Sequence, residues 1–332
     1  MSYTEYKKHL EKHGYVIIPN TLNPNEIFFA KELFFNMIES IPNYHTLHSK
    51  IDPHGINKFL GYPGHTEFAW YCRTRPQIID TFANLWNTTT DNLVCSFDGS
   101  CYIPENSRCN TNCWTHTDQS SKDSSLICYQ GFVALTNNKD NSLVVYKNSH
   151  KLHKQYFIQI QEKLQSDLDF IKDKINTTDN PEYLDKLRKQ ETILNTKLTT
   201  FNKNKSKHWN LIDPEFLQTI KDDRIILNVK AGDLVIWDSR TFHQNIVSNP
   251  KEERLVQYIS MLPKDSKLNS KSQQKKRLQY LKDLRTTSHW AYPITVVPKT
   301  PRTYGNKDLM IDYDSYPKPN LEPYLDIIKT LV

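Results

Sequence analysis

The spacing of apolar residues divides the chain into segments of different character. Residues 1–90 carry apolar positions at helical spacing, most clearly over 76–86. Over 91–262 the period falls to two, as in strands, except that residues 151–207 return to two helical stripes separated by a polar turn. This pattern predicts a mainly β, α+β fold: a β core over 91–262, N-terminal helical support over 1–90, and an inserted helical hairpin over 151–207.

Local signals mark where some elements begin or turn. Asn23 can cap free helix amides, Pro24 suits the first helical position, and Glu26 completes a capping box. Further along, Ala231-Gly232-Asp233 predicts a turn between two apolar runs. We expect those runs to form a β-hairpin, with His243 just beyond it.

Composition bounds the class of protein. The chain has 332 residues, 37% of them hydrophobic, so we expect residues 1–332 to form one domain with a C-terminal extension over 263–332. No apolar run predicts a membrane helix, and the N-terminus lacks the apolar core of a secretory signal. We therefore expect an intracellular, cytoplasmic protein, in which the 6 cysteines are free thiols. Abundant lysine and asparagine with scarce glycine are typical of an AT-rich genome, such as that of a large DNA virus.

Charge gives a weaker indication of partners. The net charge is +6, and much of the excess of lysine and arginine lies in residues 151–207. Such a basic face can bind nucleic acid, but it is more often simply solvated, so this role is not favoured. Because each helical stripe must be buried against something, a lid or a homodimer arm explains the hairpin better. The positive balance mildly favours an anionic substrate.

Two histidines and one aspartate have the spacing of a metal site. His116 and Asp118 lie two residues apart, so on an extended strand their side chains point to the same side. His243 can join them only if distant strands close back on each other, as in a jelly-roll barrel. Two imidazoles and one carboxylate hold Fe(II) on one face and leave the opposite positions open, which predicts oxygen chemistry.

Further candidates line the same predicted barrel. Arg254 lies in a segment that alternates like a strand, and its guanidinium can grip a carboxylate with two parallel hydrogen bonds. This indicates a dicarboxylate co-substrate. Gln130 can donate a hydrogen bond into the barrel, and Asn245 lies on the same side as His243, so both are candidate co-substrate contacts. Trp114 is expected to form a wall of the pocket.

Each residue alone also fits an ordinary structural role. His116 can be a hydrogen-bonded core histidine, and His243 a surface residue at a strand end. Arg254 can form an ion pair with Glu252 or Asp238. It is the joint pattern that favours the metal site.

Two other parts of the sequence leave their roles open. Arg73 and Arg75 precede the helix predicted over 76–86, and we expect both to face solvent. Residues 286–293 combine a histidine, two aromatic residues and hydroxyls. They either fold over the mouth of the site or form a loop pinned by aromatic packing.

Taken together, these motifs resemble the phytanoyl-CoA dioxygenase-like branch of the Fe(II)/2-oxoglutarate-dependent oxygenases. The resemblance is carried by Gly-Tyr-Val-Ile-Ile-Pro-Asn at 14–20, His-Thr-Asp at 116–118, Ser-His at 149–150, and Ala-Gly-Asp at 231–233 with His243 and Arg254. Family members often have a glycine before the Ser-His pair, where this chain has Asn148. Asparagine tolerates the left-handed conformation, so the departure is minor.

The resemblance implies a fold, a cofactor set and a reaction. The implied fold is a double-stranded β-helix, or jelly-roll barrel. His116, Asp118 and His243 would be the catalytic Fe(II) ligands, and Arg254 would bind the distal carboxylate of 2-oxoglutarate. The implied reaction uses 2-oxoglutarate and O2 to hydroxylate, or oxidatively demethylate, a C–H bond of a small-molecule substrate, with release of succinate and CO2.

Two other functions remain compatible with the sequence. A non-catalytic protein that binds nucleic acid or another partner on a jelly-roll scaffold would show salt-sensitive affinity and no succinate production. The protein can also be a metal-dependent jelly-roll enzyme that does not use 2-oxoglutarate, such as an epimerase or a cysteine-type dioxygenase. Arg254 argues against this function, because such chemistry does not need a residue that anchors a dicarboxylate. The identity of the substrate is not predicted.

Overall fold

The core of the protein lies between two antiparallel β-sheets. Its structure, a computed structural model, describes residues 2–41, 43–51, 62–205, 207–298 and 316–332, together with 306 and 309. Side chains from both sheets form one buried apolar cluster, to which Phe132, Val145 and Val235 belong. The sheets therefore face each other and share one interior, which agrees with the predicted α+β class.

The larger sheet has six strands. Its order is β1-β9-β5-β11-β2, and β3 also pairs with β11. The strands are β1 Tyr15–Ile18, β2 Leu93–Cys95, β3 Ser100–Ile103, β5 Tyr129–Ala134, β9 Leu234–Asp238 and β11 Arg254–Pro263. Residues 93–101, part of the region with a period of two, are divided into the strands β2 and β3, because the two pair with different parts of the long strand β11.

The smaller sheet has five strands in the order β7-β4-β10-β6-β8. They are β4 His116–Thr117, β6 Leu143–Tyr146, β7 Asn210–Leu211, β8 Arg224–Ile226 and β10 His243–Asn245. β4 lies between β7 and β10, so three segments that are far apart along the sequence are adjacent in space.

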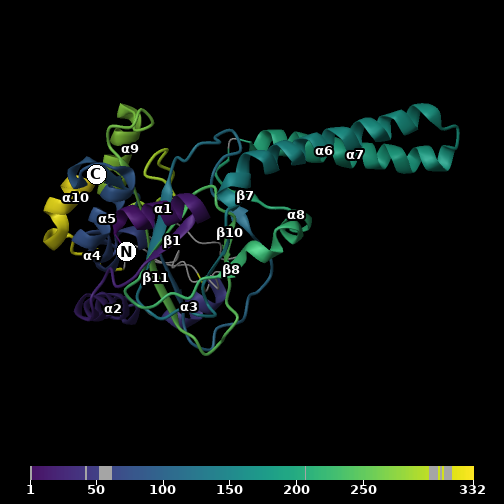
Figure 1. Cartoon of the computed structure of the whole chain (residues 1–332). Coiled ribbons are helices and arrows are strands. Elements are labelled where there is room, and N and C mark those ends of the chain that lie inside the picture. Colours follow the sequence, from purple (N-terminus) through teal and green to yellow (C-terminus); the bar gives the residue numbers. More distant parts are fainter. Residues whose placement is uncertain are drawn as a thin grey trace.

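Helices cover the outer face of the larger sheet (Figure 1). They are α1 Tyr3–His13, α2 Pro24–Glu39, α4 Glu67–Arg73, α5 Pro76–Trp86 and α10 Leu325–Leu331, while α3 spans Tyr44–Ile51. The helix predicted over 76–86 is confirmed, and so is the capping box of α2, in which Asn23 and Glu26 each accept from the other's backbone N–H. The sequence analysis missed α1, α3 and α4.

The turn at residues 231–233 is present, but the hairpin predicted around it is wrong. Gly232 adopts a φ of +91°, and the Asp233 carboxylate accepts hydrogen bonds from the backbone N–H groups of Asn20 and Lys230. The strand before the turn, β8, pairs only with β6, whereas the strand after it, β9, pairs with β1 and β5. The turn therefore carries the chain from one sheet to the other.

The inserted helical hairpin is confirmed and projects away from the body (Figure 1). It consists of α6 Ser149–Thr177 and α7 Pro181–Asn204, and α8 Pro214–Thr219 follows it. The first turns of α6 pack on the body through Tyr156 and Phe157. The chain returns from α7 alongside α6, where Lys205 Nζ donates to Gln161 Oε1 at 2.8 Å. Asn148, just before α6, has a φ of +64°, the conformation that glycine would adopt most easily.

The C-terminal extension is anchored on the body. Its helix α9 spans Lys271–Lys282, where the buried Arg277 guanidinium donates to Asn269 Oδ1 and to the Ala291 carbonyl. None of the six cysteines forms a disulfide. Within the part of the chain that the structure describes, no helix is long and apolar enough to cross a membrane.

The expectation that Arg73 faces solvent is wrong. Its side chain is fully buried, and its guanidinium donates to the backbone carbonyls of Gly64 and Asp98 at 3.2 and 2.9 Å. It also lies over the Trp70 ring, with 4.6 Å from Cζ to the centroid. A buried arginine is retained when carbonyl oxygens satisfy its donors, and here it fixes the loop between β2 and β3.

His65 joins the C-terminal extension to the body. Its side chain is completely buried, its Nε2 lies 3.1 Å from the Arg285 carbonyl oxygen, and its ring packs 4.7 Å from that of Phe97. Burial, reinforced by the nearby Arg73 charge, lowers the pKa of His65 to about 3. The folded protein therefore keeps this imidazole neutral at pH 5, where the unfolded chain protonates it.

We predict that His65 makes the fold sensitive to acid. His65 does not destabilise the fold at pH values above 6.5, its ordinary pKa. As the pH falls from 6.5 toward 3, the destabilisation grows, because only the unfolded state gains a proton. From pH 7 to pH 5, wild type should lose about 2 kcal/mol more unfolding free energy than His65→Gln. Denaturant titrations at both pH values measure this, with the exposed His45→Gln as control. Equal losses in wild type and His65→Gln would contradict the prediction.

Candidate metal centre

Strand pairing brings the two candidate histidines together. His116 in β4 and His243 in β10 are directly opposite each other in an antiparallel register. Opposite residues of neighbouring strands point to the same face, and here the two ring centroids lie 4.4 Å apart. Their convergence depends on a single strand register.

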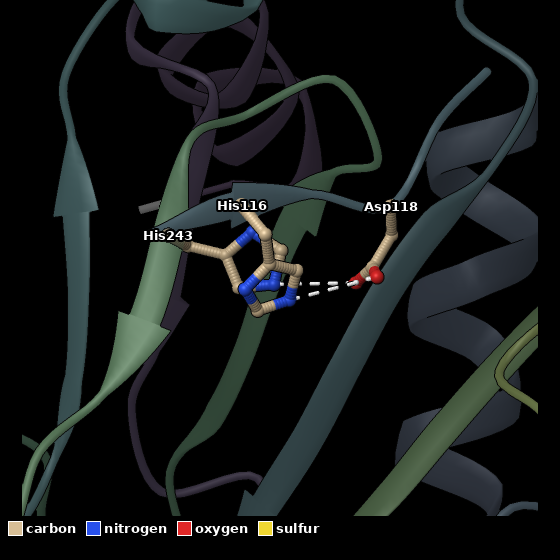
Figure 2. Close-up of side chains that lie close together, drawn as sticks. All are labelled: His116, Asp118 and His243. Atoms are coloured by element: carbon tan, nitrogen blue, oxygen red, sulfur yellow. Dashed lines mark ion pairs between the residues drawn. The ribbon is translucent and has the colours of Figure 1, made fainter. Parts of the chain in front are cut away.

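Asp118 completes the set from just beyond β4. Its backbone N–H donates to the Ser239 carbonyl at 3.2 Å, which turns the chain so that the carboxylate faces both imidazoles. Asp118 Oδ1 lies 3.6 Å from His116 Nε2, and Oδ2 lies 3.2 Å from His243 Nε2, as the dashed lines in Figure 2 show. Metal–nitrogen bonds of about 2.1 Å place adjacent ligand atoms about 3 Å apart, so these separations suit one cation.

The second nitrogen of each imidazole has a backbone partner. His116 Nδ1 lies 3.3 Å from the Trp114 carbonyl oxygen, and His243 Nδ1 lies 2.8 Å from that of Thr241. An N–H at Nδ1 that donates to a carbonyl leaves the lone pair on Nε2, which is the tautomer that a metal requires. Both Nε2 atoms face Asp118.

The protonation states also fit a divalent cation. Burial, together with the neighbouring His243, lowers the pKa of His116 to about 4. Burial opposes ionisation of Asp118, but the imidazoles of His289, His116 and His243 hold its pKa well below the usual value. Near neutral pH the site therefore presents a neutral His116 imidazole and an ionised carboxylate, as metal binding requires. His116, Asp118 and His243 form the one cluster of metal-binding geometry among the described residues.

Arg254 lies in the same cavity, which has a volume of about 730 Å³. Its side chain is 1% exposed, with Nη2 donating to Asn245 Oδ1 at 3.0 Å and Nη1 at 3.4 Å from Cys101 Sγ. The alternative ion pairs with Glu252 and Asp238 do not form, and across the described residues no carboxylate oxygen lies within 4.0 Å of this guanidinium. A buried charge without a counterion is costly, so this part of the cavity is suited to an anionic ligand.

The other sequence candidates also line the cavity, but each already has a partner. Gln130 Nε2 donates to Asp118 Oδ2 at 3.1 Å, so this residue orients a metal ligand. Asn245 holds Arg254 through its oxygen and donates through Nδ2 to the Tyr258 hydroxyl at 3.2 Å. Trp114 forms a wall, as predicted, and stacks on His116.

Three buried polar atoms of the cavity lining lack a hydrogen-bond partner in the described structure: Gln130 Oε1, Trp237 Nε1 and Arg254 Nε. One is an acceptor and two are donors. Because unpaired buried polar groups are costly, these atoms are suited to a polar ligand such as a carboxylate and its bound water.

Residues 286–293 fold over the mouth of the site, and they also pack by aromatic side chains. Thr286, Ser288 and His289 line the cavity, while Trp290 and Tyr292 are buried beside the larger sheet. Both readings of this cluster therefore hold.

The sequence analysis missed Asp98, Trp209 and Tyr258 as members of the site. Asp98 follows β2, and its Oδ2 lies 3.0 Å from His289 Nδ1. Nothing in the local sequence around Asp98 indicates its distant partner. For Tyr258 the sequence contains one weak signal. It lies four residues after Arg254 in the same strand, and therefore on the same face of the sheet.

Comparisons with known proteins place this geometry in context. No protein-family model matches the chain. A curated relative, Ava biosynthesis cluster protein O from Aspergillus versicolor, is 26% identical over 279 residues, covering 79% of this chain and 78% of the relative. This relative is fungal, so the viral source suggested by composition gains no support.

Solved structures give a likeness of fold. GlcNAc Inducible Gene 2 (GIG2, DUF1479) from Candida albicans matches 97% of this chain and 73% of its own, at 13% identity and a TM-score of 0.57. The epimerase SnoN, solved with Fe3+, alpha ketoglutarate and nogalamycin RO, covers 79% of this chain and 83% of its own at 13% identity. Its TM-score is 0.42.

We predict that each of the three ligands is required for metal binding. Changes in residues that merely orient ligands cost about 10- to 100-fold in metal affinity, so His116→Ala, Asp118→Ala and His243→Ala should each cost more than roughly 100-fold. Titration with Co(II), followed by its visible absorption, measures the loss. The control is His45→Ala, which replaces an exposed histidine distant in sequence from the three ligands. Wild-type affinity in any of the three variants would remove that residue from the ligand set.

Proposed function

We propose that this protein is an Fe(II)- and 2-oxoglutarate-dependent dioxygenase of the phytanoyl-CoA dioxygenase-like type, built on a jelly-roll barrel. The observation that carries the proposal is that the buried ligand set and a buried guanidinium without a carboxylate partner share one cavity. A 2-His-1-carboxylate site suits Fe(II), and a guanidinium beside it suits the far end of a dicarboxylate. The two facing antiparallel sheets support the barrel.

In this proposal His116, Asp118 and His243 hold Fe(II), and Arg254 holds the distal carboxylate of 2-oxoglutarate. Bound Fe(II) with 2-oxoglutarate supplies the activation of O2 for oxidation of a substrate C–H bond, with succinate and CO2 released. Hydroxylation, or demethylation through a hydroxylated carbon, is the reaction favoured by a site whose carboxylate ligand is present.

The protein's own residues orient the reactants and exclude water. Asn245 fixes the Arg254 guanidinium, and Gln130 fixes the Asp118 carboxylate, so both act on the site through another residue. Whether they also touch the co-substrate stays a prediction. The interaction of the Arg254 guanidinium with a carboxylate is stronger in this buried position than it would be on the surface, because little water competes for the carboxylate.

The proposal also includes the predicted domain organisation, substrate class and cellular location. The whole chain would act as one domain, with its helical support over 1–90, jelly-roll core over 91–262 and extension over 263–332. Its substrate would be a small molecule, and its location cytoplasmic.

The proposal is tested by incubating Fe(II)-loaded protein with labelled 2-oxoglutarate in air and under nitrogen. Succinate and labelled CO2 should form only in air. Arg254→Lys loses one of two charge-assisted hydrogen bonds, about 1.5–3 kcal/mol, and should raise the half-saturating 2-oxoglutarate concentration roughly ten- to a hundred-fold. Arg75→Lys, outside the cavity, is the matched control.

The outcome separates the competing functions. Absence of succinate with intact Co(II) binding would favour a metal enzyme that does not use 2-oxoglutarate. Absence of both, with salt-sensitive binding of nucleic acid, would favour the non-catalytic alternative.

We also propose that the hairpin pairs with a second copy of the chain. Phe170 of α6 and Ile193 of α7 are 60% and 54% exposed and line one shallow groove. Exposed apolar side chains that gather in a groove are typical of an interface. Sedimentation of the whole chain should show a dimer that Phe170→Asp with Ile193→Asp disperses, whereas Leu268→Asp, an exposed leucine on the body, leaves it intact. A monomeric wild-type chain would rule out this pairing.

A further inference from the structure

Part of the cavity is left over once the metal and the co-substrate are placed. A volume of about 730 Å³ is in the range that holds a drug-sized ligand, and a five-carbon dicarboxylate fills only a part of it. The remaining wall includes Trp209, the segment that carries Thr286, Ser288 and His289, and Asp98. This wall is where a substrate would lie.

The segment that carries His289 is held rigidly against the body. Thr287 accepts at Oγ1 from the Phe97 N–H and donates its own N–H to the Phe97 carbonyl, each at 2.9 Å. Thr286 Oγ1 accepts from the Gly64 N–H at 3.0 Å. His289 therefore enters the site on a fixed support, so it can serve as a binding group with little loss of entropy.

Asp98 orients the His289 ring. Asp98 Oδ2 lies 3.0 Å from His289 Nδ1, which points the opposite nitrogen, Nε2, toward Asp118 at 3.5 Å from its Oδ2. The Arg73 guanidinium donates to the Asp98 backbone carbonyl at 2.9 Å and so holds the backbone of Asp98 in place. With a cation bound to Asp118, Nε2 of His289 faces the space beside the metal. Because Nδ1 donates to Asp98, a hydroxyl there can donate to Nε2 or accept from it, according to whether Nε2 carries a proton.

Trp209 provides a flat apolar surface at the mouth. Its side chain is 51% exposed, and its ring centroid lies 5.6 Å from that of His116, at 34° to it. A tryptophan that is half exposed at the rim of a cavity is suited to stack with an aromatic ring, which favours planar over saturated rings.

The charges of the lining argue against an ionic substrate. Asp118 serves the metal, Arg254 serves the co-substrate, and Asp98 is paired with His289. No lining carboxylate or guanidinium among the described residues is left to balance a charge on the substrate.

We infer that the substrate is a neutral molecule with a planar aromatic ring system and a hydroxyl group, in which Trp209 stacks on the ring and the Asp98-held His289 binds the hydroxyl beside the metal. This inference rests on the proposed function, because it assigns the other charges of the cavity to the metal and to 2-oxoglutarate.

Three small probes of similar size test it. The whole chain is loaded with redox-inert Ni(II) and 2-oxoglutarate and titrated by ligand-observed NMR with 2-naphthol, naphthalene and decahydro-2-naphthol. 2-Naphthol has both features, and each of the others lacks one. A stacking contact or a hydrogen bond contributes about 0.5–1.5 kcal/mol, so 2-naphthol should bind roughly 3- to 10-fold tighter than either reference.

Two variants separate the two contacts. Trp209→Leu should remove the preference for 2-naphthol over decahydro-2-naphthol while retaining that over naphthalene. His289→Phe should do the reverse. Phe28→Leu, which alters an aromatic residue 65% exposed on α2, should change neither preference. Retained Ni(II) and 2-oxoglutarate binding shows that each variant is folded at the site.

The inference is overturned if 2-naphthol binds no tighter than the two references, or if both preferences survive in Trp209→Leu and in His289→Phe. Failure of the proposed function appears separately, in the titrations with Ni(II) and 2-oxoglutarate. Ring and hydroxyl preferences in a protein that binds neither Ni(II) nor 2-oxoglutarate would leave the Trp209 and His289 contacts standing but remove the proposed function, and with it the placement of the hydroxyl beside a metal.

Discussion

The register between β4 and β10 is the constraint on which the site depends. Because side chains alternate along a strand, a slip of one residue would turn His243 away from His116. β4 has only two residues, so its own ladder provides few hydrogen bonds. Gln244 supplies more: its Oε1 accepts from the Trp114 N–H at 3.0 Å and from the Thr115 hydroxyl at 2.6 Å. A buried side chain next to a ligand thus holds the register that brings the ligands together.

The site also depends on the distribution of buried charge. Asp118 is surrounded by imidazoles, whereas an amide oxygen, a thiol sulfur and the face of Phe132 lie near the Arg254 guanidinium. The fold thus maintains one negative and one positive group in the same low-dielectric cavity without letting them neutralise each other. Each is then available to an external partner of opposite charge, and the stability that this arrangement costs is recovered on binding.

The sequence allowed the ligand set, Arg254 and the inserted hairpin to be predicted, because each leaves a local pattern. His-x-Asp has strand spacing, Arg254 lies in an alternating segment, and the hairpin has helical stripes. The helix α1 also has a local signal that was overlooked, a capping box between Ser2 and Glu5.

What could not be predicted depends on long-range pairing. Asp98 and His289 are 191 residues apart, and neither residue's neighbours indicate the contact. The burial of Arg73 follows from two carbonyl acceptors that only the folded loop provides. The turn at Gly232 is local, but which sheet each flanking run joins is decided by strand partners far along the chain. Alternation therefore predicts a strand, but not its neighbours.

The side-by-side arrangement of α6 and α7 allows the length of the hairpin to vary. Since α6 and α7 run side by side and Lys205, just after α7, lies against Gln161 in α6, matched turns can be added to or removed from the far end of the hairpin without moving the strands on either side. Chain length in this region is thus uncoupled from the geometry around the ligands. We expect homologues whose helical hairpins differ greatly in length to keep the same arrangement of strands around the site.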